Sequence, residues 1–303
     1  MGDHAEAASE PARSCAWCRE PLADVDRRPG LAICRACGAA TTDPVPSDCE
    51  LERAYASWYR PPGGRFAGPG DRLLARSRGV LARRLDRIAP PGPVLDVGSG
   101  EGALLRALRD RGREAVGLER EASGPGVRAG DLRDVDEQWA AIVLWHSLEH
   151  LRDPGDVAAH AAGLLAERGV LVIAMPNAAS LQARAFGDRW FALDLPRHLV
   201  HVPAAALVGR LEALGLRVER VSHARGGQIA FGWLQGLVGL LPGRPDLYDA
   251  LRRPEARRRP LGGARRAATI AAGAALSPVA VAASAVEIGA GRGGTVYVEA
   301  RRV

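Results

Sequence analysis

The stretch VLDVGSGEGALL, Val94 to Leu105, constrains the fold more than any other part of the chain. A short apolar run typical of a strand leads into three alternating glycines and then into a helical pattern, so the backbone must turn sharply. Gly98, Gly100 and Ala103 satisfy the G-x-G-x-x-G/A pattern of dinucleotide-binding loops. Gly98, Gly100 and Gly102 equally satisfy a G-x-G-x-G pattern, so the loop predicts a ligand close to the backbone without deciding which one.

After Pro93, short apolar runs alternate with amphipathic stretches. The alternation predicts an α/β fold of the Rossmann-like, doubly wound type, in which helices cover both faces of the sheet and ligands bind beyond the carboxyl ends of the parallel strands. Helices are expected at Ala103–Arg111 and Asp156–Glu167, and Asp71 is expected to cap an earlier one. The expected strands are Val94–Val97, Ala115–Leu118, Ala141–Trp145, Val170–Met175, Leu216–Val221 and Thr295–Ala300.

Acidic residues lie at or just after the ends of the first three short strands of this pattern. Asp96 lies two residues before Gly98, where a carboxylate would repel a pyrophosphate but suits a cationic ligand. Glu119 ends the second strand, where an acid accepts hydrogen bonds from ribose hydroxyls in either class of cofactor. Asp131 and Leu132 follow a third short strand, where we expect an adenine amino group to be bound.

With these residues the sequence resembles the class I S-adenosylmethionine-dependent methyltransferases. The motifs VLDVGSGEG, GLE, AGDL and IVLWHSLEHLRDP stand in that family's order within Pro93 to Arg301. The stretch from LWHSLEHL to PRHLVH is similar to a bacterial subgroup related to the ubiquinone-biosynthesis O-methyltransferases. The resemblance implies S-adenosylmethionine as methyl donor and a seven-stranded sheet in which the last strand is antiparallel and forms a hairpin with the one before it. It implies cofactor contacts from Asp96, Gly98, Ser99, Gly100, Gly102, Glu119, Asp131, Leu132 and Trp145.

One position departs from the family pattern. Trp139 and Ala140 stand where the family's fourth strand usually opens with Phe-Asp, which removes one polar group near the cofactor pocket. Two other functions therefore stay open beside methyl transfer. The chain could be a nicotinamide-dependent oxidoreductase, or a protein that binds S-adenosylmethionine without catalysis.

Five polar side chains in two segments are the candidate catalytic residues. His146, Glu149 and His150 follow the fourth strand, and His198 and His201 come from PRHLVH after the fifth strand. A hydroxyl acceptor must be aligned with the methyl group and must lose its proton. We expect O-methylation of a small or lipid-like acceptor, with C- or N-methylation of a sugar or natural-product intermediate as the alternative.

Three roles stay open for these five residues. A similar E-x-x-E-H element in some class I methyltransferases holds a divalent cation, and His146 stands here in place of the first Glu. Two imidazoles and a carboxylate suit a transition ion better than Mg²⁺. In the second interpretation His146 or His150 is a general base without a metal. In the third the residues only shape the pocket wall, which Trp145, Trp190 and Phe191 would extend.

Four of the five cysteines form two C-x-x-C pairs. Cys15, Cys18, Cys34 and Cys37 match the C-x2-C-x15-20-C-x2-C spacing of zinc sites, and Cys49 lies outside it. Four thiolates leave no open position for water, so we expect a structural zinc ribbon without catalysis at the metal. Unligated or redox-active thiols are the alternative, and docking of a carrier or partner is a further role for such a ribbon.

The chain divides into three parts by composition. Residues 1–48 are expected to form the zinc ribbon, 49–92 a linker with an amino-terminal helix, and 93–303 the methyltransferase domain. Within the linker, Tyr55, Trp58 and Tyr59 are weak candidates for covering the cofactor.

A helical insertion, residues 224–294, precedes the last strand. It contains the apolar run Ile229–Leu241, an arginine-rich segment and the uncharged run Ala267–Val286, which is long enough to span a bilayer but rich in alanine. Three interpretations stay open for Ala267–Val286: a membrane span, a helix that lies on a membrane or covers the substrate, or ordinary helical packing.

The net charge of +6 does not indicate a nucleic-acid partner. All 41 basic residues are arginines, in a chain rich in Ala and Gly, which indicates the codon usage of a GC-rich coding sequence. The start, Met1 to Arg13, lacks the apolar core of a signal peptide, so we expect a cytoplasmic protein with reduced thiols. Contact with a membrane surface would come only from the insertion, and the oligomeric state is not predicted.

Overall fold

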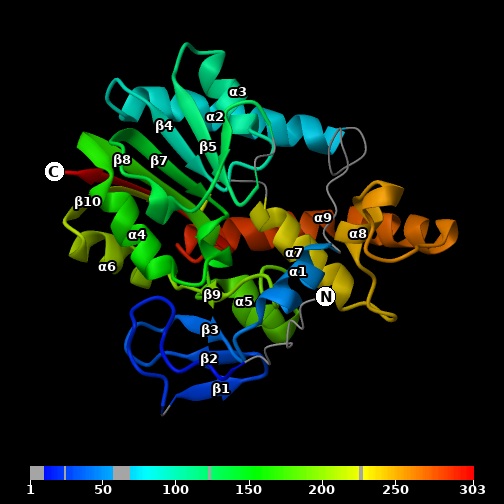
Figure 1. Cartoon of the computed structure of the whole chain (residues 1–303). Coiled ribbons are helices and arrows are strands. Elements are labelled where there is room, and N and C mark those ends of the chain that lie inside the picture. The colour runs from blue at the N-terminus through cyan, green and yellow to red at the C-terminus, as the bar shows by residue number, and fades with distance from the viewer. Residues whose placement is uncertain (1–9, 24, 57–68, 122–123, 225–227) are drawn as a thin grey trace, which may run out of the picture.

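A seven-stranded sheet forms the centre of the molecule (Figure 1). The computed structural model describes residues 10–23, 25–56, 69–121, 124–224 and 228–303. The strand order is β10-β11-β8-β7-β4-β5-β6. Neighbours from β8 to β6 are parallel, whereas β11 is antiparallel to both β8 and β10, so the predicted α/β sheet is confirmed. The strands are β4 (Val94–Val97), β5 (Ala115–Glu119), β6 (Val127–Ala129), β7 (Trp139–Trp145), β8 (Leu165–Pro176), β10 (Leu216–Ser222) and β11 (Thr295–Arg302).

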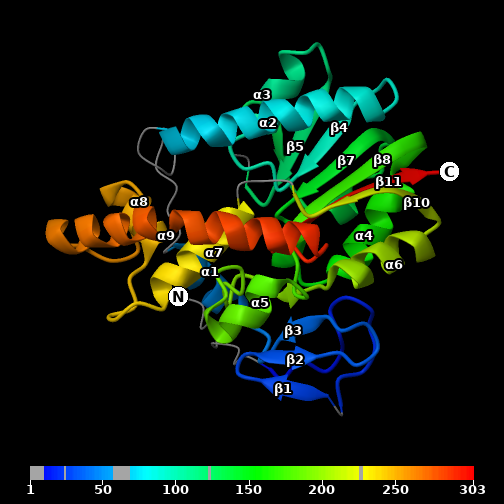
Figure 2. The same cartoon turned by 180° about the vertical axis from the view of Figure 1, so that it is seen from behind.

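Helices cover both faces of this sheet, because its central strands carry apolar side chains on both sides. One face packs against α2 (Pro69–Ile88) and α3 (Ala103–Arg109) through a core of buried leucines and valines. The other face packs against α4 (Pro154–Gly163) and α6 (Ala204–Ala213). Figures 1 and 2 show the two pairs of helices on opposite sides of the strands.

Two predicted helix boundaries are wrong. Helix α2 begins at Pro69, so Asp71 lies inside the helix and not at its N-cap position. Proline is favoured at such a start because the first N–H groups of a helix have no partner within it. Helix α4 ends at Gly163 and β8 begins at Leu165, so the helix does not continue to Glu167. Leu165 is fully buried and pairs with β7, so packing in the sheet outweighs helix propensity.

The amino-terminal residues form a second, small sheet. Strands β1 (Asp26–Arg28), β2 (Leu31–Ile33) and β3 (Ala40–Thr42) are antiparallel, and β3 pairs in turn with β9 (Val200–His201). Because β9 follows β8 in the chain, this sheet joins the amino-terminal segment to the segment that carries His198. Sequence analysis missed this pairing, since a two-residue strand leaves no periodic signal.

The insertion before β11 is helical, as expected. It contains α7 (Gln228–Gly239), α8 (Leu247–Leu251) and α9 (Gly263–Gly289), and α7 and α9 pack side by side (Figures 1 and 2). Among the described residues α9 alone is long and apolar enough to cross a membrane by length and composition. The remaining elements are α1 (Asp48–Ala56), α5 (Leu181–Phe186), and the short 3-10 helices η1 (Leu132–Asp134), η2 (Leu148–His150), η3 (Gly187–Arg189) and η4 (Pro254–Ala256).

Candidate functional site

The candidate site lies where β4, β5 and β7 end. Val97 at the end of β4 pairs with Leu118 of β5 and with Leu144 of β7, so the segments that follow these strands lie side by side. These segments are the glycine loop, the chain after Glu119, and the turn that begins at His146. Doubly wound sheets bind their ligands at this edge.

The glycine loop is held tightly against the turn after β7. Gly98, Gly100 and Gly102 all have positive φ, at 77°, 55° and 70°. A Cβ on Gly98 would lie 2.5 Å from the Cβ of Ser147, so no larger residue fits there. The hydroxyls of Ser99 and Ser147 are buried without a hydrogen-bond partner among the described residues. The glycine loop and the turn after β7 therefore lie in contact, and each carries a buried serine hydroxyl without a hydrogen-bond partner among the described residues.

Two carboxylates flank the glycine loop. The Gly100 N–H donates to the Glu119 carboxylate at 2.5 Å, which ties the loop to the end of β5. Asp96 is only 4% exposed. Burial raises the pKa of its carboxyl to about 7, the charge of Glu119 adds to this effect, and the charge of Arg78 opposes it. A cation placed beside Asp96 would therefore stabilise its ionised form, which burial disfavours.

Asp131 and Leu132 lie where β6 leads into η1. The Asp131 carboxylate accepts from the backbone N–H of Arg133 at 2.9 Å and pairs with its guanidinium at 2.8 Å, which lowers the pKa of Asp131. The Leu132 side chain is 3% exposed and belongs to the core, so only its backbone can face a ligand.

Arg78 of α2 is a residue of this site that sequence analysis missed. Its guanidinium carbon lies 5.0 Å from the centre of the Trp145 ring, and its charge acts on Asp96. Trp145 also packs against Tyr297 and the edge of His146. An arginine in an arginine-rich helix carries no local signal of such a role.

His146 and Glu149 form a pair in the turn after β7. His146 adopts a left-handed φ of 53°, which non-glycine residues rarely do, and its Nδ1 lies 3.2 Å from Glu149 Oε1. Burial would raise the pKa of Glu149, but the hydrogen bond with His146 and the charge of that imidazole outweigh it and lower the pKa to about 2. Glu149 Oε2 is buried and has no partner among the described residues.

The imidazoles of His150 and His198 meet beside Glu149, with ring centres 4.6 Å apart. His150 Nδ1 lies 3.0 Å from the Arg197 carbonyl, and His198 Nδ1 lies 2.7 Å from the Ala192 carbonyl. A carbonyl only accepts, so both Nδ1 atoms carry the hydrogen and both Nε2 atoms keep a lone pair. Burial lowers the pKa of both imidazoles, so they are neutral at neutral pH.

Of the five candidate catalytic residues, the structure brings three together as a group that could hold a metal ion. One ligand atom from each of Glu149, His150 and His198 lies within 4.8 Å of the others. His146 contacts this trio through Glu149. His201 lies behind it in β9, where its Nε2 lies 2.9 Å from the Leu193 carbonyl.

Tyr55 of α1 joins the same group from the amino-terminal part of the chain. Its hydroxyl lies 3.1 Å from His150 Nδ1, and the Arg120 guanidinium lies 5.5 Å from its ring centre. Trp58 and Tyr59 fall outside the described residues. Tyr55 thus lies beside the candidate catalytic residues.

The cysteines of the two C-x-x-C pairs come together in the turns beside the amino-terminal sheet. Cys15 Sγ lies 3.7 Å from Cys37 Sγ, Cys18 Sγ lies 3.6 Å from Cys34 Sγ, and all four atoms are mutually within 4.8 Å. This spacing is compatible with one tetrahedral ion. Cys49 is exposed on α1 and takes no part.

The amino-terminal sheet is anchored on the segment that carries His198. The Thr42 hydroxyl donates to the His198 carbonyl at 2.7 Å, and the Thr42 N–H donates to the Leu199 carbonyl at 3.0 Å. Trp17, which is 2% exposed, donates from its indole to the Ala206 carbonyl. The cysteine cluster is therefore physically connected to one side of the candidate site.

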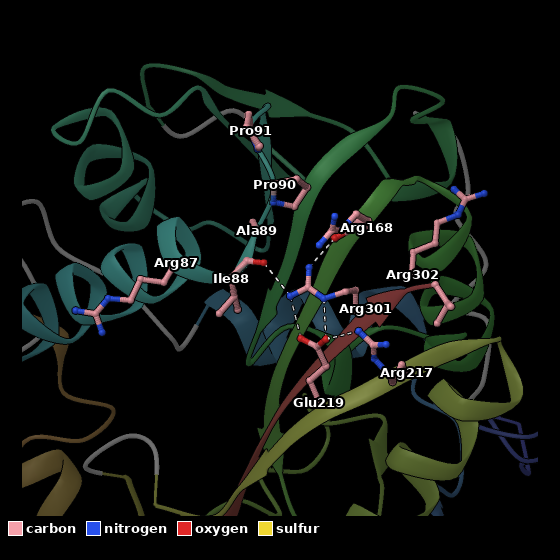
Figure 3. A pocket seen from close by; sticks show the side chains of 11 residues that line it. Arg87, Ile88, Ala89, Pro90, Pro91, Arg168, Arg217, Glu219, Arg301 and Arg302 are labelled. Carbon is pink, nitrogen blue, oxygen red and sulfur yellow. Dashed lines mark hydrogen bonds and ion pairs between the residues drawn. The ribbon is translucent and has the colours of Figure 1, made fainter.

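The large pocket in Figure 3 lies at the other end of the sheet. It encloses about 770 Å³ and is lined by the chain before β4, the start of β10 and the end of β11. Arg301 fills much of its floor, with hydrogen bonds to both Glu219 oxygens and to the carbonyls of Ile88 and Arg168. None of the predicted site residues lines this pocket.

A family model described as a methyltransferase domain matches residues 72–221. Geranyl diphosphate methyltransferase in complex with SAM is a similar solved structure, at 14% identity over 85% of this chain and 92% of that chain, with a TM-score of 0.48. A SAM-dependent methyltransferase from Archaeoglobus fulgidus is 18% identical over 74% of this chain and 94% of that chain, with a TM-score of 0.44. The [4+2]-cyclase SpnF is 18% identical over 74% of this chain and 80% of that chain, with a TM-score of 0.45.

No protein of curated function matches the sequence. Structural likeness at these identities and TM-scores says nothing about the reaction, so the matched domain and the strand order carry the assignment. Together they support an enzyme of the class I methyltransferase type.

Proposed function

We propose that the protein binds S-adenosylmethionine at the glycine loop and transfers its methyl group to the hydroxyl of a small or lipid-like acceptor. The observation that supports this proposal is the trio Glu149, His150 and His198. Two of its members follow Ser147 in the turn after β7, and Ser147 lies against Gly98 of the loop. A methyl acceptor placed there would meet the methyl donor and two neutral imidazoles at once.

The residues around the loop suit S-adenosylmethionine better than a dinucleotide. Among the described residues, Arg78 supplies the positive charge that acts on buried Asp96, so the Asp96 carboxylate can pair with the amino group of the methionine part. The Glu119 carboxylate, already oriented by Gly100, can accept from ribose hydroxyls. The unpaired hydroxyls of Ser99 and Ser147 offer further hydrogen bonds. A pyrophosphate at the same place would meet the negative charge of Asp96.

The proposed reaction needs a proton acceptor. As the acceptor oxygen forms its bond to the methyl carbon, the carbon–sulfur bond breaks and the sulfur keeps the electron pair. The hydroxyl proton must leave, and the Nε2 lone pair of His150 or His198 can take it, because the Nδ1 hydrogens are held by carbonyls. In His198 the Nε2 lies 3.8 Å from Asp194 Oδ2, a carboxylate that would also stabilise the protonated ring. Glu149 would stabilise the imidazolium that results.

The same trio could instead hold a divalent cation, and this is the second way in which we propose that the acceptor hydroxyl is activated. Metal-bound histidines typically donate their other N–H to a carbonyl, as His150 and His198 both do here. Glu149 Oε2 has no partner among the described residues and could be the third ligand. A cation there would lower the pKa of a bound hydroxyl. Nitrogen ligands favour Mn²⁺ or Zn²⁺ over Mg²⁺.

Aromatic side chains near the trio favour an apolar acceptor. Phe191, which follows η3, packs against Phe231 of α7 and Tyr248 of α8, with ring centres 5.3 to 5.5 Å from its own. Phe191 directly precedes Ala192, whose carbonyl accepts from His198 Nδ1. An activity screen across phenols, sugars and lipids would identify the acceptor. Methylation on carbon or nitrogen, or of RNA alone, would contradict the O-methylation proposal.

The role of the trio is tested with His150→Ala and Glu149→Ala, assayed with and without a chelator and with added Mn²⁺ or Zn²⁺. His160→Ala is the matched control, since His160 lies on α4 and its Nε2 contacts the Val135 carbonyl. We expect both variants to lose methyl transfer and the control to keep it. Activity that ignores chelation while the ribbon keeps its zinc would exclude the cation and leave the general base. Full activity in both variants would refute any chemical role.

For the cysteine cluster we propose one structural zinc ion. The division into a ribbon at 1–48, a linker at 49–92 and a catalytic domain at 93–303 is part of the same proposal, as is a cytoplasmic location with reduced thiols. The metal site is supported by the mutual distances of the four sulfurs.

A further inference from the structure

The outward face of α9 is apolar along nearly its whole length. From Ala267 to Gly289 every solvent-exposed residue is Ala, Val, Ile, Pro or Gly. The exposed fractions of Val279, Val281 and Val286 are 53%, 61% and 65%. A helix on the surface of a soluble protein normally turns polar residues outward. This face therefore lacks a partner in the part of the chain that the structure describes.

The opposite face of α9 is fixed to the protein. Glu287 is fully buried, and its carboxylate accepts from the Gln182 backbone N–H at 2.9 Å, the Gln182 side chain at 2.8 Å and the Trp233 indole at 2.8 Å. Gly273 lies so close to Leu247 that its added Cβ would meet that side chain at 3.0 Å. The apolar face is therefore a permanent part of the surface.

The helix is not placed to cross a bilayer. Its antiparallel neighbour α7 has 12 residues, whereas a crossing needs about 20. The strands on either side of the insertion, β10 and β11, pair with each other in the central sheet. A surface contact, with α9 parallel to the membrane plane, keeps all of these contacts.

Arginines stand at both ends of the apolar face. Residues 242–266 contain eight arginines and three acidic residues. Arg265 is exposed and precedes Val279 and Val286 by multiples of seven residues, so it lies on the same side of α9. Arg292 is exposed just beyond the other end. If two copies of the chain paired through this face, arginines would meet arginines whether the two α9 helices ran parallel or antiparallel. The phosphates of anionic lipids would instead neutralise the arginine charges.

We propose that the outward face of α9 binds the surface of an anionic lipid bilayer. The valines enter the boundary between headgroups and acyl chains, and the arginines at the ends contact lipid phosphates. Each buried valine side chain strengthens partitioning by about tenfold, and each arginine near the surface by about fivefold. This binding does not depend on the identity of the methyl acceptor.

The test is co-sedimentation of the full chain with two kinds of vesicle, one of phosphatidylglycerol mixed with phosphatidylcholine and one of phosphatidylcholine alone. We expect binding to the anionic vesicles, about a hundredfold loss of partitioning in the Val279→Gln/Val286→Gln variant, and about a fivefold loss in Arg265→Gln. The control is Val303→Gln, at an 85% exposed valine at the carboxyl terminus, which should bind as the wild type does. Thermal unfolding shows that each variant is folded.

Three results would overturn the proposal. Wild-type protein that sediments with neither vesicle lacks the binding surface, and equal binding to both vesicles removes the role of the arginines. A dimer in sedimentation velocity that the double valine variant disperses, without vesicle binding, would assign the face to a second copy of the chain.

Discussion

The amino-terminal sheet should hold the segment of His198 in place, and Thr42→Val tests this connection. Thr42 is 5% exposed, and its hydroxyl donates to the His198 carbonyl at 2.7 Å. Valine keeps the shape of the side chain but cannot donate, so the carbonyl loses this donor in a buried place. A buried polar group left unsatisfied costs about 1–3 kcal/mol, and we expect the free energy of unfolding to fall by that amount.

Thr41→Val is the matched control. Thr41 is also 5% exposed and lies in the same strand, but its hydroxyl accepts from the backbone N–H of Ala16, within the amino-terminal segment. We expect Thr41→Val to lower the free energy of unfolding by a similar amount, because it also leaves one buried group unpaired. The two variants should therefore lose similar free energies of unfolding and differ only in which segment becomes less protected from amide hydrogen exchange.

Urea unfolding measures the free energy of both variants, and amide hydrogen exchange locates the effect without any need for the acceptor. Thr42→Val should speed exchange in residues 194–201, whereas Thr41→Val should leave that segment as in the wild type. Equal exchange in this segment for both variants, or no loss of stability in Thr42→Val, would refute the idea that the amino-terminal sheet positions the site.

Three further predictions concern single groups. The raised pKa of Asp96, about 7 against 3.8 when unfolded, means that its contribution to stability is lost as pH rises from 3.8 through 7. Asp96→Asn should therefore raise the free energy of unfolding above pH 7 by on the order of 4 kcal/mol. Below pH 3.8 the same substitution should change the free energy of unfolding little. Urea unfolding at a series of pH values that shows no pH dependence of this increase would contradict the raised pKa. Glu119→Ala should weaken S-adenosylmethionine binding by about 1.5–3 kcal/mol in calorimetry, because a charge-assisted hydrogen bond is lost, and equal weakening in the exposed control Glu121→Ala would count against a specific contact. Cys15→Ser should lose the bound zinc in elemental analysis while Cys49→Ser retains it, and protein purified without chelator that holds no zinc would refute the metal site.

The sheet could be predicted from the sequence because its strands are buried on both faces. Such strands appear as short apolar runs, and all six that were predicted lie within observed strands. The glycine loop between strand and helix could also be predicted, and the structure adds that Gly98, Gly100 and Gly102 have positive φ. The C-x-x-C pairs likewise predicted the cysteine cluster. In each case the signal is local in the sequence.

Contacts between distant segments could not be predicted in this way. The pairing of β3 with β9, the position of Arg78 over Trp145, and the contact of Tyr55 with His150 all join residues far apart in the chain. None of them has a periodic or spacing signal. The end of α4 was missed for a related reason, because the burial of Leu165 in the sheet outweighs local propensity.

The central claim is that the glycine loop binds S-adenosylmethionine, and calorimetry of the wild-type chain tests it most directly. The protein is titrated in turn with S-adenosylmethionine, with its demethylated product and with NAD. Because the cation of the methionine part pairs with Asp96, whose pKa is about 7, affinity for S-adenosylmethionine should increase as pH rises through 7 and binding should release protons. Binding of the first two ligands with this pH dependence, and none of NAD, is the predicted result. Tight binding of NAD alone would contradict the account.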